Sequence, residues 1–275
     1  MNYKVLNNGV KMPCIAFGTW NLEMGSKAKE AVLEALKVGY RSIDCAYSYG
    51  NDFSVGKAIK ESGISREDLF VTNKVWNDFR TKDSVVEVCK KSLKLMKLDY
   101  FDLYLVHWPV SEEDENWKQI NFDVWQGMEQ LYKEGFVKAI GVSNFNQNQI
   151  EALKECGAKI LPMVNQIEFH PGYLQEEIVA YCKANDIVVE AWSPLGSGNV
   201  FENKTLKTIA KKHGKSVAQI CLKWEIQKGV VPIPRSSNPE RIAGNIDVFD
   251  FELSKEDIAL IDSITDIAGN LFKLN

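Results

Sequence analysis

The stretch FDLYLVH, residues 101–107, is apolar at nearly every position before it ends in a histidine. Successive side chains of a β-strand point to opposite faces, so a strand with one wet face alternates polar and apolar residues. A continuous apolar run instead indicates a strand covered on both faces, as in a parallel sheet flanked by helices. The stretch therefore predicts a buried parallel strand with a titratable side chain at its carboxyl end.

Seven further runs of this kind occur along the chain. They are CIAFGT (14–19), RSID (41–44), LFVTNK (69–74), VKAIGVSN (137–144), MVNQIE (163–168), IVVEAWS (187–193) and VVPIPR (230–235). Segments with helical spacing lie between them, at 26–39, 83–97, 123–135, 147–157, 174–185 and 216–229. Parallel strands need crossover connections of this length, and eight strand–helix units close a barrel.

We therefore predict an α/β fold, a single (β/α)8 TIM barrel in which residues 1–275 form one domain. A doubly wound sheet would carry GxGxxG after its first strand, and FGTWNLEMG at residues 17–25 does not fit that motif. Ahead of the first strand, YKVLNNGVKMP (3–13) predicts a β-hairpin that turns at Asn7-Asn8-Gly9 and caps the barrel bottom.

Composition narrows the function classes. A net charge of −4 makes no electrostatic case for nucleic acid, and no apolar run is long enough for a spanning helix. The six cysteines form no CxxC pair and the three histidines lack HxH or HExxH spacing, so we expect free thiols and no metal site. The first residues lack the apolar stretch of a secretory signal. We expect a cytoplasmic monomer with no nucleic-acid or membrane partner.

Polar side chains gather at the carboxyl ends of the predicted strands, where this fold places its chemistry. These ends carry Asp44, Lys74, His107, Ser143-Asn144 and Gln166, and Tyr47 and Tyr49 follow Asp44 in SIDCAYSYG. Singly, each has an ordinary explanation, such as a turn aspartate, a solvated lysine or a packed histidine. On neighbouring strand ends of one barrel, they form a candidate catalytic group.

The chemistry of this group is coherent. A phenol titrates near pH 10, a nearby ammonium lowers that pKa, and a carboxylate keeps the ammonium charged. We expect the phenol pKa to fall by about 2–3 units, which takes about 3–4 kcal/mol of interaction with the lysine. Such a phenol could protonate a developing alkoxide, while the imidazole orients the carbonyl oxygen.

Converting a carbonyl group into an alkoxide also needs a source of electrons, for which an organic cofactor is the candidate. Two loops at the same end of the barrel suit the phosphates of such a cofactor. EAWSPLGSG (190–198) has glycines that permit close backbone approach, and IPRSSNPERIAGN (233–245) starts a helix at a capping residue followed by proline. Arg235 and Arg241 match a phosphomonoester, although ordinary surface charge remains the alternative for this pair.

Eight motifs together resemble the aldo-keto reductase family over nearly the whole chain. They are GTW, IDCAYSYGN, TNKVWN, YLVHWP, IGVSNF, NQIEFHP, AWSPLG and IPRSSNPERIAGN, in the family's order. The resemblance implies NADPH-dependent reduction of aldehydes and reactive ketones, among them small dicarbonyls and sugar-derived or aromatic carbonyls. The layout is similar to that of bacterial diketogluconate or methylglyoxal reductase-like members.

The resemblance also implies residue roles. Tyr49, five residues beyond Asp44, would donate the proton, with Asp44 supporting Lys74, Lys74 tuning Tyr49 and His107 positioning the substrate; Tyr47 would pack. The implied cofactor contacts are Ser143, Asn144, Gln166, Trp192, Ser193, Leu195, Gly196, Ser197, Arg235, Ser236, Arg241 and Asn245. Gly244 stands where many members have Glu or Gln against the adenine, which puts one adenine contact in doubt.

The substrate mouth is expected to be formed by Trp20, Ser48, Trp76 and Trp108, with core packing as the alternative for each tryptophan. The tail TDIAGNLFKLN (265–275) is short beside the closing loop of many members, so we expect an open pocket and loose selectivity. Two other functions remain open at this point: a non-catalytic NADPH-binding sensor or regulatory barrel, and, less favoured, a barrel hydrolase.

Overall fold

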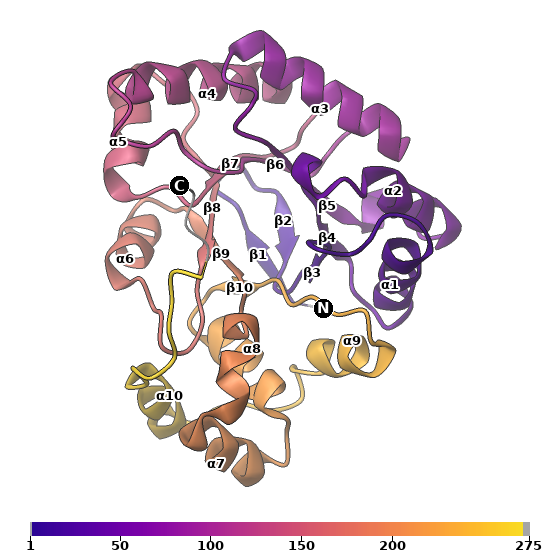
Figure 1. The fold of residues 1–275 in the computed structure, drawn as a ribbon, viewed down its shortest axis with the longest axis vertical. Coiled ribbons are helices and arrows are strands. Elements are labelled where there is room, and N and C mark those ends of the chain that lie inside the picture. The colour runs from indigo at the N-terminus through magenta and orange to yellow at the C-terminus, as the bar shows by residue number, and fades with distance from the viewer. Residues whose placement is uncertain (1, 272–275) are drawn as a thin grey trace.

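The computed structural model describes residues 2–271 of the 275-residue chain. The described part begins with an antiparallel hairpin of β1 (Tyr3–Val5) and β2 (Lys11–Pro13). Its turn includes Gly9 in the left-handed region, at φ +87°, where a residue without Cβ is favoured. Figure 1 shows the hairpin lying across one end of the ring of strands, which confirms the predicted cap.

Within the described residues, eight parallel strands form one sheet in which sequence neighbours are hydrogen-bonded neighbours. They are β3 (Phe17–Gly18), β4 (Ser42–Asp44), β5 (Phe70–Val75), β6 (Leu103–Val106), β7 (Ile140–Ser143), β8 (Val164–Glu168), β9 (Val188–Trp192) and β10 (Val231–Pro232). Every predicted apolar run coincides with one of these strands, and only β5 extends beyond its run, by one residue.

Backbone hydrogen bonds between the first and last strands close the ring. The Ala16 N–H donates to Pro232 O at 3.0 Å, and the Gly18 N–H donates to Pro234 O at 3.0 Å. Since both prolines lack an N–H, all of the donors in this seam come from the β3 side. The predicted (β/α)8 TIM barrel is confirmed.

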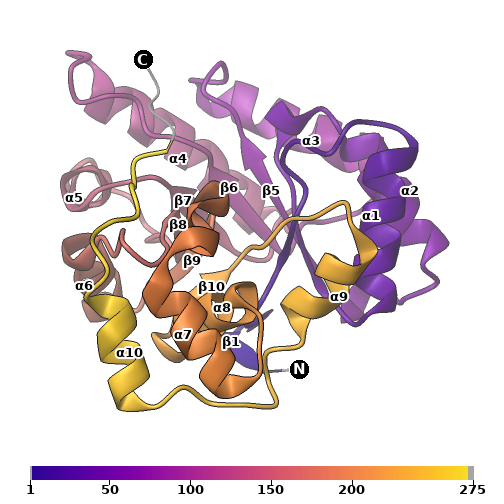
Figure 2. The same cartoon turned by 60° about the horizontal axis from the view of Figure 1, so that its bottom comes forward.

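Helices surround the barrel, as Figures 1 and 2 show. They are α1 (Ser26–Lys37), α2 (Asp52–Glu61), α3 (Lys82–Met96), α4 (Trp117–Lys133), α5 (Gln147–Glu155), α6 (Glu176–Ala184), α7 (Lys204–His213), α8 (Val217–Gln227), α9 (Pro239–Ile246) and α10 (Lys255–Asp262). Short 3-10 helices occur at η1 (Tyr47–Tyr49), η2 (Arg66–Asp68) and η3 (Gly196–Glu202). No helix in residues 2–271 is long and apolar enough to cross a membrane.

The structure adds three helices, α2, α7 and α10, to the six segments predicted from helical spacing and to the helix predicted in IPRSSNPERIAGN, which is α9. In α2 the helical signal is interrupted by Gly56, a poor helix former. A Cβ at this glycine would lie only 2.3 Å from Met96 O, at the end of α3. The glycine is therefore needed for close helix packing, which is a tertiary demand that local sequence spacing does not reveal.

The parallel strands bring all of their carboxyl ends to one end of the barrel. The loops that leave β3 to β7, β9 and β10 therefore border a common cleft, opposite the hairpin, and β8 contributes Gln166 to it. The segment after α10 runs back along the side of the barrel toward β8 (Figure 1), where the Leu271 N–H donates to Glu168 Oε2 at 3.0 Å.

Candidate active site

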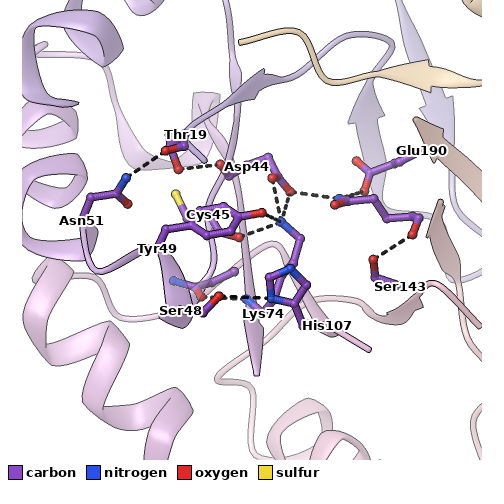
Figure 3. Close-up of polar contacts among 12 residues, drawn as sticks. Thr19, Asp44, Cys45, Ser48, Tyr49, Asn51, Lys74, His107, Ser143 and Glu190 are labelled. Carbon is purple, nitrogen blue, oxygen red and sulfur yellow. Dashed lines mark hydrogen bonds and ion pairs between the residues drawn. The ribbon is translucent and has the colours of Figure 1, made fainter. Parts of the chain in front are cut away.

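Four predicted catalytic residues meet at the carboxyl ends of β4, β5 and β6 (Figure 3). Lys74 Nζ is fully buried and donates to both Asp44 oxygens, at 2.8 and 2.7 Å. It also donates to Cys45 O at 2.9 Å and lies 3.4 Å from Tyr49 OH. The ammonium therefore joins a buried carboxylate to a phenol that borders the cleft, as the predicted mechanism requires.

Burial decides the resting protonation of the phenol. It raises the pKa of Tyr49 to about 12, although the charge of Lys74 and its hydrogen bond act in the opposite direction. This differs from the net lowering of the phenol pKa expected from the sequence, because desolvation of the phenolate outweighs the ammonium. Tyr49 is consequently protonated at neutral pH and is available as a proton donor.

Lys74 remains an ammonium despite its burial. Burial by itself disfavours the charged form, but the charge of Asp44 and its hydrogen bonds act in the opposite direction, and the pKa of Lys74 lies above its ordinary value. A permanent cation beside the phenol favours any negative charge that develops on the phenol oxygen during proton donation.

His107 follows β6 and faces the same cleft. Burial, reinforced by the charge of Lys74, holds its pKa well below the ordinary value, so the imidazole is neutral. Ser48 Oγ lies 3.4 Å from His107 Nδ1. If the serine hydroxyl donates to Nδ1, the proton of the ring sits on Nε2, which is then a hydrogen-bond donor.

The two tyrosines of η1 have different surroundings. Tyr49 contacts the His107 ring edge-to-face, with centroids 5.7 Å apart, and lines the cleft. Tyr47 instead packs edge-to-face on Phe79 at 5.2 Å, and its hydroxyl accepts from Lys91 Nζ at 3.2 Å. The geometry therefore singles out Tyr49 as the candidate acid and leaves Tyr47 to packing.

The cleft has a volume of about 1480 Å³. Clefts for drug-sized ligands measure roughly 300–1000 Å³, so this one has room for a dinucleotide together with a small carbonyl compound. All of the predicted site residues line it except Lys74, which lies beneath the floor, and Gly196, which is buried and faces His170 and Ile267.

One end of the cleft holds a cluster of amides and hydroxyls. Ser143 Oγ donates to Gln166 O at 2.8 Å, and Asn144 Nδ2 donates to His107 O and to Ser143 Oγ, both at 3.0 Å. Trp192 Nε1 donates to Asn144 Oδ1 at 2.7 Å. This cluster lies next to the catalytic residues, where the resemblance predicts the nicotinamide carboxamide.

The other end of the cleft has the donors that suit a phosphate. α9 starts with Asn238 as its cap, whose Oδ1 accepts the Arg241 N–H at 3.0 Å, and with Pro239 in its first turn. Ser236, Arg241 and Asn245 line this end. The residues present therefore fit an anionic cofactor such as NADPH, and the individual phosphate contacts stay predictions.

Arg235 makes contacts that the sequence did not predict. Its Nε and Nη2 donate to Trp20 O at 3.0 Å and to Asn21 O at 3.1 Å, so it ties the loop after β3 to the loop after β10. Its predicted contact with a 2′-phosphate remains a prediction. At Gly244, an added Cβ would meet no heavy atom of the described residues within 4 Å, so packing does not demand the glycine.

The predicted substrate-mouth residues Trp20, Ser48, Trp76 and Trp108 all line the cleft. Trp76 lies edge-to-face on His107, with centroids 5.0 Å apart, so its ring borders the catalytic group. Of the tail, residues 265–271 are described and none of them lines the cleft, whereas 272–275 lie outside the described part. The described chain thus leaves the mouth uncovered by its tail, in line with the expected open pocket.

Comparison with known proteins identifies the chain. The model of the aldo/keto reductase family matches residues 14–266. The chain belongs to the aldo/keto reductase family. This confirms the resemblance found in the sequence.

Among the proteins similar to this aldo/keto reductase, two are named for a compound that they reduce. Glyoxal reductase of Bacillus subtilis (strain 168) is 49% identical over 94% of this chain and 91% of the relative. The 9,11-endoperoxide prostaglandin H2 reductase of Trypanosoma cruzi (strain CL Brener) is 43% identical over 96% and 92%.

Solved structures agree in fold. An aldo-keto reductase from a Medee basin deep-sea metagenome library has a TM-score of 0.92 and 44% identity, covering 98% of this chain and 97% of that one. The Bombyx mori aldo-keto reductase in complex with NADP has a TM-score of 0.87 and 39% identity, covering 95% and 92%.

Sequence reasoning about this aldo/keto reductase missed several residues at the cleft. Asn21, Phe201 and Glu240 line it. Beneath the floor, Glu190 is 1% exposed and accepts a hydrogen bond from Gln166 Nε2 at 2.9 Å. The sequence did contain an indication of Glu190, because a glutamate within the otherwise apolar run IVVEAWS is unexpected in a buried strand.

Proposed function

We propose that this aldo/keto reductase catalyses the NADPH-dependent reduction of aldehydes and reactive ketones to alcohols. Small dicarbonyls are the first candidates, since glyoxal reductase of Bacillus subtilis is 49% identical, and sugar-derived and aromatic carbonyls are further candidates. The observation that carries the proposal is the 3.4 Å contact between Tyr49 OH and Lys74 Nζ, beside a cleft that His107 also lines.

NADPH, when bound, supplies a hydride to the carbonyl carbon. In the proposed mechanism Tyr49, protonated at neutral pH, donates its proton to the carbonyl oxygen as negative charge develops there. Lys74 stabilises the charge left on the phenol oxygen, and Asp44 holds Lys74 in place. The neutral imidazole of His107 orients the carbonyl oxygen through Nε2.

The family resemblance suggests the cofactor roles, and the two ends of the cleft support them. Ser143, Asn144 and Gln166 are proposed to bind the nicotinamide carboxamide, and Trp192 to lie under the ring. Ser193, Leu195, Gly196 and Ser197 are proposed to surround the pyrophosphate, and Arg235, Ser236, Arg241 and Asn245 the adenosine 2′-phosphate. Their support is the gathering of all but Gly196 along one cleft.

The direct test is Tyr49→Phe, which removes one hydroxyl and keeps the ring. We expect a loss of about 10²- to 10⁴-fold in kcat for methylglyoxal, the usual contribution of a general acid. NADPH oxidation is followed by absorbance, and NADP⁺ affinity, measured by tryptophan fluorescence, should change little. Equal turnover by the variant and the unaltered protein would refute Tyr49 as the acid.

The alternative is a non-catalytic barrel that binds NADPH as a sensor or regulatory subunit. The assembled Asp44–Lys74–Tyr49 group argues against it, because binding alone needs no buried ammonium beside a phenol. Tight NADPH binding without turnover on a broad panel of carbonyl compounds would favour it.

We further propose that the protein works as a cytoplasmic monomer, with residues 1–275 as one domain and no nucleic-acid partner. Six free cysteines suit a reducing compartment, and the net charge of −4 does not attract nucleic acid. Sedimentation analysis would test the monomer, because a dimer at micromolar concentration would contradict it.

A further inference from the structure

Glu190 occupies a position that is costly for a carboxyl group. It lies in β9, paired in register with Gln166 of β8, so both side chains project on the same side of the barrel wall. The residue is 1% exposed, and Oε1 has no hydrogen-bond partner among the described residues. Burying a carboxyl oxygen without a hydrogen-bond partner costs free energy, so the presence of Glu190 at this position needs an explanation.

The hydrogen bonds of Gln166 indicate that task. Its Nε2 donates to Asp44 Oδ1 at 3.0 Å and to Glu190 Oε2 at 2.9 Å. An amide nitrogen has two hydrogens, so both donors of the side chain are used. The reversed amide would set its oxygen against the carboxylate of Asp44, the ion-pair partner of Lys74, which excludes that orientation. Gln166 therefore presents its side-chain oxygen, an acceptor, to the cleft that it lines.

We propose that Glu190 is a positioning residue that fixes the Gln166 amide, so that Gln166 Oε1 accepts a hydrogen bond from the carboxamide NH₂ of the nicotinamide. This inference rests on the proposed function, because it assumes that the nicotinamide binds beside Gln166. Glu190 does not line the cleft and acts only through its neighbour. In Figure 3, dashed lines join Asp44 and Glu190 to one nitrogen between them, which the two hydrogen bonds identify as Gln166 Nε2.

The arrangement does not require Glu190 to be charged. Burial, and then the charge of Asp44, raise the pKa of Glu190 to about 7, while Gln166 and Lys74 act in the opposite direction. A protonated carboxyl group keeps a carbonyl oxygen, so it can still accept from Gln166 Nε2. The position therefore needs an acceptor of this size rather than an anion, and that distinction can be tested.

Two variants separate the acceptor from the charge. Glu190→Met keeps the length of the side chain but removes the acceptor, whereas Glu190→Gln removes the charge and keeps a carbonyl oxygen. Binding of NADP⁺ is measured by quenching of tryptophan fluorescence, since several tryptophans line the cleft. We expect Glu190→Met to weaken NADP⁺ about tenfold, the worth of one hydrogen bond, and Glu190→Gln to remain within about threefold of the unaltered protein.

The deciding ligand is the 3-acetylpyridine analogue of NADP⁺, in which a methyl group replaces the carboxamide NH₂. It cannot donate to Gln166, so we expect Glu190→Met and the unaltered protein to bind it equally. A variant that weakens both ligands equally, or neither, would overturn the proposal. If Glu190→Met does not fold, as judged by circular dichroism, Glu190→Leu replaces it with the same expectations.

Failure of the proposed function can be distinguished from failure of this inference. If the unaltered protein does not bind NADP⁺, both proposals are overturned. Normal NADP⁺ binding and carbonyl turnover in the unaltered protein, together with a Glu190→Met variant that affects the binding of NADP⁺ and of the analogue to the same extent, would overturn the role of Glu190 alone.

Discussion

Replacing Lys74 by methionine removes the ammonium but leaves an unbranched side chain of similar length. In the structure this ammonium contacts both oxygens of Asp44 and lies 3.4 Å from Tyr49 OH. The substitution therefore has two effects. Tyr49 loses the cation that lowers its pKa against the effect of burial, and Asp44 loses its ion-pair partner. The first effect bears on catalysis and the second on stability.

The catalytic effect can be worked out from the distance. Two unit charges separated by the observed 3.4 Å interact by about 5 kcal/mol at an effective dielectric constant of about 20. If about half of the phenolate charge has developed in the transition state, the loss is about 2.5 kcal/mol, or about 60-fold in kcat. A fully formed phenolate would bring the loss to about 4000-fold. We expect the measured kcat to fall by a factor between these values.

The stability effect needs a control. Removing one partner of a buried ion pair costs about 3–5 kcal/mol, because the other charge is left unpaired. The double variant Asp44→Asn/Lys74→Met removes both charges and should recover much of the melting temperature of the unaltered protein. It should not recover activity, since the phenol still lacks its cation.

The assay combines steady-state reduction of methylglyoxal with thermal unfolding and NADP⁺ titration for the three proteins. The reasoning is refuted if folded Lys74→Met keeps kcat within about threefold of the unaltered protein. It is also refuted if the double variant regains activity along with stability, since the loss in the single variant would then reflect folding alone.

Three other predictions concern separate parts of the molecule. Arg241→Ala should weaken NADP⁺ about 10- to 100-fold but NAD⁺ only slightly, and equal losses would contradict a 2′-phosphate contact. Ser48→Ala should lower kcat/KM for methylglyoxal about 3- to 10-fold without changing NADP⁺ affinity, because His107 loses the hydroxyl beside Nδ1, and an unchanged kcat/KM would contradict this. Burial by itself would raise the pKa of Asp257, but hydrogen bonds from Lys212 and His213 lower it to about 2. Since this lies below the unfolded value of about 3.9, the stabilisation is complete above about pH 4 and is lost as the pH falls toward 2. The gap in melting temperature between Asp257→Asn and the unaltered protein should therefore narrow over that range, and a constant gap would contradict the assignment.

Much of the site could be predicted because a barrel collects the carboxyl ends of its strands. Asp44, Lys74 and His107 are far apart in the sequence, yet each stands at the end of an apolar run, and the rule for barrels brings such ends together. The choice of Tyr49 over Tyr47 came from the family resemblance, and the geometry of η1 supports it. Gly196 does not line the cleft, and its contact with the pyrophosphate stays a prediction.

The sequence by itself determined the barrel, because strands covered on both faces leave a continuous apolar signature that needs only local reading. Tertiary structure alone decided the proposed role of Glu190. Its hydrogen-bond partner, the side-chain amide of Gln166, also donates to Asp44, which lies 122 residues away in the sequence. It also decided that the pKa of Tyr49 rises rather than falls. Desolvation depends on everything that packs around a group, and hydrogen-bond satisfaction depends on which atoms meet, so neither can be read from residue spacing.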